Sequence, residues 1–292
     1  MAQAGVIQGT PLPRETTLDQ SVARIRIVTV IGVIAAWEVL ALVGRLGFLY
    51  TDVIPSSWTI AVAIGEELVS AGFYRDLGIT FAEHIVGFVG GSTIALFLGI
   101  AMGTNVLLRK SLEPYLNAIG STPKIIFLPI LFLMFGTGIE SKMAKGALSA
   151  FFPVVFTTAL GMLLINPVLI KVGRSFNLSK WQMIAKIYVP AMVNPVITGL
   201  RLAIAITVIG VLVAELKFAD GGLGHRLGIY YEQFRIAPMY AIILIIFAIA
   251  AAANTGMTRF QDRVNRHMAP TESKGRKRGS AASGNLGIVA TN

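Results

Sequence analysis

Six long apolar stretches constrain the fold of this 292-residue chain more than any other feature of its sequence. Each stretch approaches the roughly 20 residues that a helix needs to cross the hydrocarbon core of a bilayer. Only 14% of the residues are charged and 54% are hydrophobic, whereas soluble domains carry about 25% charge. The pattern predicts an all-α polytopic membrane protein with six transmembrane helices. The predicted spans cover about 27–43, 82–102, 115–135, 143–164, 191–213 and 239–256.

The distribution of charge predicts how the spans are oriented. The net charge is +10, and most of the 25 Lys and Arg residues lie in the two tails and in the connections on the same side of the membrane. The positive-inside rule therefore places both termini in the cytoplasm. We read the basic excess as an orientation signal rather than a nucleic-acid site, and expect no nucleic-acid partner. The basic residues predicted on the opposite side are Arg45, Arg75, Lys142, Lys217, Arg226 and Arg235.

The chain divides by composition into three parts. Residues 1–26 read as a loose cytoplasmic N-terminal tail, which lacks the basic start and apolar core of a cleaved signal peptide. Residues 27–257 hold the six spans. Residues 258–292 form a basic cytoplasmic C-terminal tail that we expect to be disordered.

The connection between spans four and five, residues 171–190, has too regular a pattern for a simple linker. Ser179 followed by Gln182 makes a capping box, which predicts a helix that begins at Lys180. Asn177 precedes this box, where the chain must turn between two short helices. Asn is one of the few residues other than Gly that tolerate the left-handed conformation such a turn requires.

The predicted helix is amphipathic. Trp181, Ile184 and Tyr188 fall on one face at helical spacing, and Pro190 is placed to end the helix and lead into span five. Such a helix either lies half-sunk in the inner leaflet or docks in the groove of a cytoplasmic partner, with Trp181 as its anchor. The residue pattern alone leaves both interpretations open.

This segment resembles the signature cytoplasmic loop (EAA loop) of binding-protein-dependent ABC importer permeases. That pattern runs Glu-Ala-Ala, three residues, Gly, nine residues, Ile, one residue, Leu, Pro. The chain keeps the spacing with Asn177 at the glycine position, followed by Ile187, Val189 and Pro190. The opening Glu-Ala-Ala is not kept, and Lys171 reverses the charge of its Glu.

Short motifs elsewhere narrow the resemblance to the nitrate/sulfonate/taurine-type permeases, across residues 27–257. They are Trp37-Glu38, Ile54-Pro55-Ser56, Pro123-Lys124 with Pro129, Phe135-Gly136-Thr137-Gly138, Ser141-Lys142, Gly199-Leu200-Arg201, Ala214-Glu215 and Gly222-Leu223-Gly224.

The resemblance implies a multi-pass permease subunit of the bacterial inner membrane that is not itself an enzyme. It implies a homodimer, two cytoplasmic ABC ATPase subunits and a periplasmic or tethered substrate-binding protein. The substrate class it implies is a small anion: nitrate, a sulfonate, taurine, bicarbonate or a carboxylate. The loop between helices 4 and 5 would be the coupling helix to the ATPases. Its implied contact residues are Arg174, Asn177, Ser179, Trp181, Gln182, Ile184, Lys186, Ile187 and Pro190.

The sequence lacks the motifs of several other activities. It has no phosphate-binding loop of the Gly-x-x-x-x-Gly-Lys-Ser/Thr type, so the energy source must be another chain or an ion gradient. Its three histidines lack metal-ligand spacing, there is no cysteine, and we expect no cofactor and no catalytic residue. Two alternatives stay open. A stand-alone secondary transporter would predict inverted repeats, whereas a membrane scaffold would leave the helix at Lys180 unexplained.

Ionisable residues in or beside the spans are the default candidates for the translocation pathway. We select Lys124, Arg201 and Glu215, the last at the outer end of span five, as the candidate pathway residues. Lys124 could instead cap a helix or extend to the inner boundary, and Arg201 could form a structural ion pair. Glu215 could gate a cavity or hold the turn 221–224.

Two further patterns predict packing. In span two, Gly87 with Gly91 and Gly99 with Gly103 have the spacing that lets helices approach closely, within the chain or between subunits. Residues 54–80 predict a short amphipathic helix on the outer membrane surface.

Overall fold

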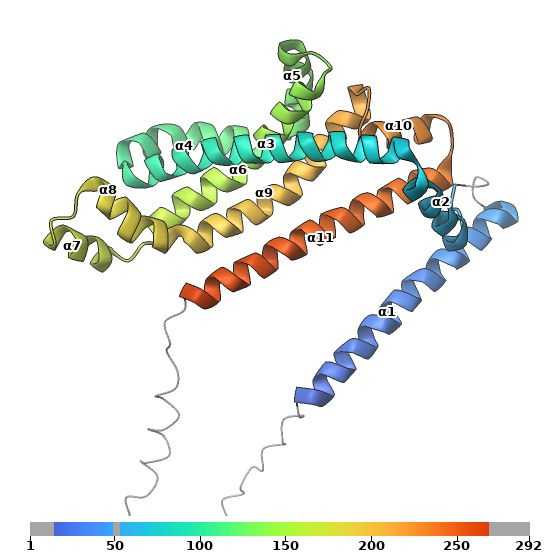
Figure 1. Ribbon diagram of the computed structural model, residues 1–292, viewed down its shortest axis with the longest axis horizontal. Helices are drawn as coiled ribbons and strands as arrows, with labels where there is room; N and C mark the ends of the chain where they lie inside the picture. Colours follow the sequence, from blue (N-terminus) through green and yellow to red (C-terminus); the bar gives the residue numbers. More distant parts are fainter. Residues whose placement is uncertain (1–14, 49–52, 269–292) are drawn as a thin grey trace, which may run out of the picture. The chain divides into compact units, whose positions relative to one another are not determined.

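A computed structural model of the chain describes residues 15–48 and 53–268. Within these residues all regular secondary structure is helical, as predicted (Figure 1). The described residues form two compact units, one of residues 15–48, 53–70 and 230–243 and the other of residues 71–229 and 244–268. The longest helices are α1 (Glu15–Val43), α3 (Ala71–Thr104), α6 (Ile139–Leu163), α9 (Val189–Phe218) and α11 (Ile236–Met268).

Five of the six predicted spans lie within continuous helices that are long and apolar enough to cross a membrane. The remaining one, predicted over 115–135, is broken. It consists of α4 (Val106–Ser121), a 3-10 turn (Lys124–Phe127) and α5 (Leu128–Phe135), which bend by 94° at the break. The described residues therefore hold five spans, or six if this bent pair counts as one.

Proline chemistry explains the break. A residue that precedes proline is disfavoured in the helical region, and Thr122 before Pro123 is extended, with φ −71° and ψ 137°. Pro129 lies in the first turn of α5, where its missing N–H costs nothing. The chain therefore changes direction at residues that the sequence analysis placed inside a single span.

The core of the larger unit is formed by α3, α6 and α9, which lie side by side (Figure 1). Ala95 from α3, Val154 and Val155 from α6 and Ala203 from α9 are completely buried. Leu112 of α4 packs against this cluster, because α4 returns along the bundle. These contacts fix the positions of the helix ends at which the candidate sites lie.

The paired glycines of α3 face α6. A Cβ atom at Gly87 would lie 2.7 Å from the Met143 carbonyl oxygen, and one at Gly91 would overlap the Ala147 backbone. A Cβ atom at Gly99 would lie 2.6 Å from Thr158 Cβ. Of the two roles predicted for these pairs, the structure shows packing within the chain.

Replacing Gly91 by alanine is expected to destabilise the larger unit by about 1–3 kcal/mol, because the added methyl forces α3 and α6 apart. The Cβ of such an alanine would lie 2.7 Å from Ala147 Cα. Gly90→Ala is the matched control, since a Cβ atom at Gly90 meets nothing within 4 Å. Thermal unfolding of both variants in detergent checks the prediction, which would be wrong if the two variants unfolded at the same temperature.

In the smaller unit, two of the motifs noted above contact each other. The Trp37 indole donates a hydrogen bond to the Pro55 carbonyl oxygen (3.0 Å), and the Glu38 carboxylate accepts one from the Ser57 backbone N–H (2.6 Å). Trp37-Glu38 therefore fixes the start of the next helix, α2 (Ser57–Val69), whose N-cap is Ser56. The predicted helix after residue 54 is confirmed, but it ends at Val69, and residues 71–80 belong to α3.

The helices extend beyond the predicted spans at both ends of the chain. α1 begins at Glu15, so residues 15–26 are helical and not the loose tail that was predicted. α11 continues to Met268, so residues 258–268 are helical as well. The apolar pattern marks only the part of a helix that matches the membrane thickness, and the polar turns beyond it carry no such signal. The rest of the predicted C-terminal tail lies outside the described residues.

Candidate functional site

The connection between α6 and α9 is a compact helical turn. α7 (Pro167–Ser175) ends in a Schellman motif, in which the Leu178 N–H donates to the Gly173 carbonyl oxygen (3.1 Å) and the Asn177 N–H donates to that of Arg174 (2.9 Å). Asn177 has the predicted left-handed conformation, with φ 50°. The turn between the two helices is therefore fixed by backbone hydrogen bonds.

The predicted capping box begins the next helix, α8 (Lys180–Met183). The Ser179 backbone N–H donates to the Gln182 side-chain oxygen (2.9 Å), and the Gln182 N–H donates to the Ser179 hydroxyl (3.3 Å). Both the capping box and the start at Lys180 are confirmed. These paired bonds satisfy donors that the first turn of a helix leaves free.

The prediction that Pro190 ends this helix is wrong. α8 continues through a π-helical turn (Ile184–Tyr188) into α9, and Pro190 lies in the first turn of α9. A π-turn changes the hydrogen-bond register by one residue, so the helix passes the proline, which has no N–H to donate. The turn is thus joined rigidly to α9.

The side chains of this turn divide into buried and exposed groups. Met183 is buried, and a Cβ atom at Gly173 would meet the ends of the Met183 and Ile187 side chains, so α7 packs closely against α8 and the π-helical turn. Trp181 is 80% exposed and Phe176 is 76% exposed. The predicted apolar face is therefore divided, because Trp181 points away from the bundle.

A cavity of about 520 Å³ lies beside these residues, at the end of α3. Ile184 and Tyr188, which were predicted to share a face with Trp181, are half-buried and line it together with Arg174. Thr104 of α3 and Lys180 complete the polar part of its lining. Lys186 is exposed outside the cavity. We call residues 166–190 and this cavity the coupling surface, after the role that the resemblance predicts for this segment.

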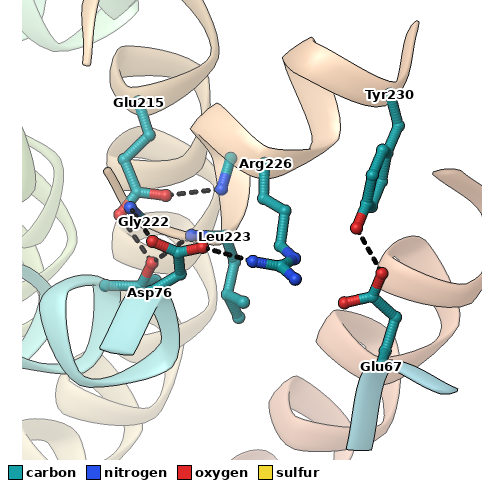
Figure 2. Close-up of polar contacts among 9 residues, drawn as sticks. Glu67, Asp76, Glu215, Gly222, Leu223, Arg226 and Tyr230 are labelled. Atoms are coloured by element: carbon teal, nitrogen blue, oxygen red, sulfur yellow. Dashed lines mark hydrogen bonds and ion pairs between the residues drawn. The ribbon is translucent and has the colours of Figure 1, made fainter. Parts of the chain in front are cut away.

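A second cluster of polar contacts holds the glycine-rich turn after α9 (Figure 2). The Glu215 carboxyl is fully buried and accepts hydrogen bonds from the Thr80 hydroxyl (2.6 Å) and the Gly224 N–H (2.6 Å). The Thr80 oxygen in turn accepts from the Leu223 N–H (2.8 Å). Of the two roles predicted for Glu215, the structure shows the one in which it holds the turn.

An ion pair adds to this cluster. Asp76 accepts from Arg226 Nη1 (2.9 Å) and from the Gly222 N–H (3.3 Å) (Figure 2). Gly222 has φ 102°, and a Cβ atom there would overlap the Glu215 carboxyl group. Only glycine meets both requirements, a left-handed backbone and no side chain. α10 (Leu223–Glu232) begins directly after this turn.

Two lysines of α6 are buried, which the sequence analysis did not foresee. Lys142 is 2% exposed and donates to the Thr137 carbonyl oxygen, while Ser141 donates to that of Gly138 (2.9 Å). The turn 136–138 is thus held by the first residues of α6. Lys145 is 3% exposed, and its ammonium group lies 3.4 Å from the Ser149 hydroxyl.

Glu83 of α3 is a further buried charged residue that the sequence analysis missed. It is 1% exposed and interacts electrostatically with Glu215 and Lys142. Glu83 and Lys145 both lie inside predicted spans, so the rule that marks intramembrane charges as candidates could have found them.

Lys124 and Arg201 have different surroundings. The Lys124 ammonium donates to the Gly120 carbonyl oxygen (2.9 Å) and lies 5.0 Å from the centre of the Phe152 ring. It therefore caps α4, as one of the alternatives predicted. The Arg201 guanidinium donates to the Asn254 side-chain oxygen (3.3 Å) and forms no ion pair with any described carboxylate.

Comparisons with known proteins agree with this architecture. Residues 91–269 match the family described as binding-protein-dependent transport system inner membrane component. A permease protein assigned to aliphatic sulfonates transport in Bacillus subtilis is 29% identical over 231 residues, which is 79% of this chain and 82% of that protein. The taurine transport system permease protein of Escherichia coli is 27% identical and covers 68% of this chain and 74% of its own length. The nitrate import permease protein of Synechococcus elongatus is also 27% identical, over 62% of this chain and 64% of that protein.

Solved structures share the fold at low sequence identity. A methionine ABC transporter in an inward-facing conformation superposes with a TM-score of 0.53 at 19% identity, over 73% of this chain and 98% of the solved chain. An amino acid ABC transporter superposes with a TM-score of 0.53 at 15% identity, over 67% of this chain and 93% of the solved chain. The helix arrangement, the family match over residues 91–269 and the related permeases lead to one conclusion. This chain belongs to the family of inner membrane components of binding-protein-dependent transport systems.

Proposed function

We propose that the chain is the permease subunit of an ATP-driven importer, working as a homodimer with two ATPase subunits and a substrate-binding protein. Both termini and the coupling surface would face the cytoplasm, because the basic residues concentrate on that side. The imported substrate would be a small anion of the nitrate, sulfonate, taurine, bicarbonate or carboxylate type, since related permeases are assigned to sulfonates, taurine and nitrate.

The observation that carries this proposal is the rigid turn with exposed aromatic side chains at the coupling surface. The Schellman motif and the capping box fix its backbone, while Trp181 and Phe176 remain exposed. Large aromatic residues are the usual anchors of protein interfaces. Because α8 continues into α9, a displacement of the turn by a partner would move a membrane span directly.

Arg201 is the pathway residue that the contacts favour. Its only described hydrogen-bond partner is a neutral amide, so its positive charge is not cancelled by a carboxylate. An intramembrane arginine in that state would attract an anion. The other two residues predicted to line the pathway bond to backbone groups, Lys124 at the end of α4 and Glu215 in the glycine-rich turn. Their pathway role stays a prediction.

Reconstitution tests the function as a whole. The purified chain is inserted into proteoliposomes with and without candidate ATPase subunits, and uptake of labelled taurine, an alkanesulfonate, nitrate and bicarbonate is measured with a candidate binding protein. We expect uptake only with the ATPase subunits, Mg-ATP and the binding protein, unaffected by a proton ionophore.

Two controls make this result decisive. Replacing the catalytic nucleotide-binding lysine of the ATPase must abolish uptake, and omitting the binding protein must reduce it to background. Uptake by the chain alone that collapses when the ion gradient is dissipated would contradict the proposal and favour a secondary transporter.

A further inference from the structure

The turn between α10 and α11 places a bulky aromatic residue in a conformation that favours glycine. The Arg235 N–H donates to the Tyr230 carbonyl oxygen (2.8 Å) and the Phe234 N–H donates to that of Tyr231 (3.2 Å), which together form a Schellman motif. Phe234 is the left-handed residue of this motif, with φ 53°. Its ring is 83% exposed, so contacts within the chain do not offset the strain.

The coupling surface contains the same motif in its ordinary form. There the left-handed position holds Asn177, a residue that tolerates it. A strained, exposed aromatic at the equivalent position of a second turn is therefore not required by the fold. Backbone strain of this kind is concentrated at functional sites.

The turn holds Phe234 in one position. The Arg235 guanidinium lies 4.8 Å from the centre of the Tyr230 ring. Tyr230 is itself buried, and its hydroxyl donates to the buried Glu67 carboxylate of α2 (Figure 2). The backbone beneath Phe234 is thus fixed from both sides of the motif.

A hollow lies directly beside the exposed ring. Phe234 lines a cavity of about 230 Å³ together with Arg45, Ser56 and Thr59. Arg45 is exposed and, with Ser56 and Thr59, supplies the polar part of a lining that is otherwise apolar. Aromatic residues and arginine are enriched in protein interfaces, whose rims are polar.

We infer that Phe234 and this cavity are a docking surface for the substrate-binding protein, an inference that rests on the proposed function. The turn lies in the connection between spans five and six, which the proposed topology places outside the cytoplasm, where a binding protein would approach. The partner would supply an apolar site for the Phe234 ring and an acidic side chain that reaches Arg45. A role as a lipid anchor explains the turn less well. An aromatic side chain that inserts into the membrane surface does not need a strained, fixed backbone.

Phe234→Gly tests this inference, since glycine relieves the strain and removes the ring. Thermal unfolding of the variant should occur at the wild-type temperature or above it. The probe is the binding protein that stimulates ATP hydrolysis by the wild-type complex. We expect its Kd for the reconstituted Phe234→Gly complex to rise about 30-fold, as for loss of an interface anchor. ATP hydrolysis without the binding protein should be unchanged.

Further variants separate the alternatives. Phe234→Trp should keep the affinity within about threefold, because it retains an aromatic anchor. Phe97→Ala, which removes a 72% exposed phenylalanine from α3, should leave the affinity unchanged. Arg45→Gln should weaken binding and reduce its dependence on salt.

An unchanged Kd in Phe234→Gly would overturn the inference and leave the proposed function intact. If lower stability in liposomes accompanied the unchanged Kd, that result would identify Phe234 as a lipid anchor. If the wild-type complex did not respond to any binding protein, the proposed function itself would fail first.

Discussion

Replacing Trp181 by glutamate is expected to raise the Kd between the permease and its ATPase subunits by about 100-fold or more, because an aromatic anchor is lost and a charge is buried in its place. Trp181 is 80% exposed, so the substitution removes few contacts within the chain. ATP-dependent uptake in proteoliposomes should fall in parallel. Affinity is measured with the purified ATPase, and thermal unfolding verifies that the variant folds.

The chain offers a matched control for this substitution. Trp58 of α2 is 77% exposed, and the proposed topology places it on the opposite side of the membrane. Trp58→Glu should therefore leave the affinity for the ATPase unchanged. The coupling proposal would be contradicted if Trp181→Glu bound the ATPase normally and if brominated lipid chains quenched the Trp181 fluorescence, measured as the difference from Trp181→Phe. That result would place Trp181 in the bilayer.

The second large effect is expected at the turn held by Glu215. Glu215→Ala leaves the half-buried Thr80 hydroxyl and the buried Gly224 N–H without their acceptor. Each unsatisfied buried group costs about 1–3 kcal/mol, and the missing side chain adds a cavity, so the loss of stability should reach about 3–5 kcal/mol. We expect the unfolding temperature to fall by roughly 10 °C and hydrogen exchange to accelerate across residues 221–226.

Two variants make this prediction specific to the hydrogen bonds. Glu215→Gln retains one acceptor oxygen and should lose less stability than Glu215→Ala. Glu66→Ala removes an exposed carboxylate from α2 and should change stability by less than about 0.5 kcal/mol. Wild-type hydrogen exchange at Gly224 in Glu215→Ala would show that the carboxyl group does not hold the turn.

The sequence was most informative where local chemistry decides the structure. The start of a helix at Lys180, the capping box and the left-handed Asn177 follow from interactions between residues a few positions apart, and all three are confirmed. The spans within α3, α6, α9 and α11 were found because their apolar runs match the thickness of the hydrocarbon core.

The predictions that rested on local sequence rules were wrong at the prolines. Pro190 was expected to stop a helix, but the π-turn before it absorbs the missing hydrogen bond. Pro123 was placed inside one predicted span, but at this residue the span divides into two helical segments bent by 94°. In both cases the geometry depends on which backbone hydrogen bonds the neighbouring turns form, and composition does not reveal this.

What the sequence by itself determined was the helical class of the protein, the approximate spans and the existence of a structured turn between spans four and five. Only the tertiary structure showed that separate segments are partners: Trp37-Glu38 with the segment 55–57, and Glu215 with Thr80 and the turn 222–224. The periodicity of apolar residues indicates only whether water or lipid surrounds a single helix. Contacts between residues as distant as Thr80 and Glu215 exist only after the packing of α3, α6 and α9 has brought their ends together.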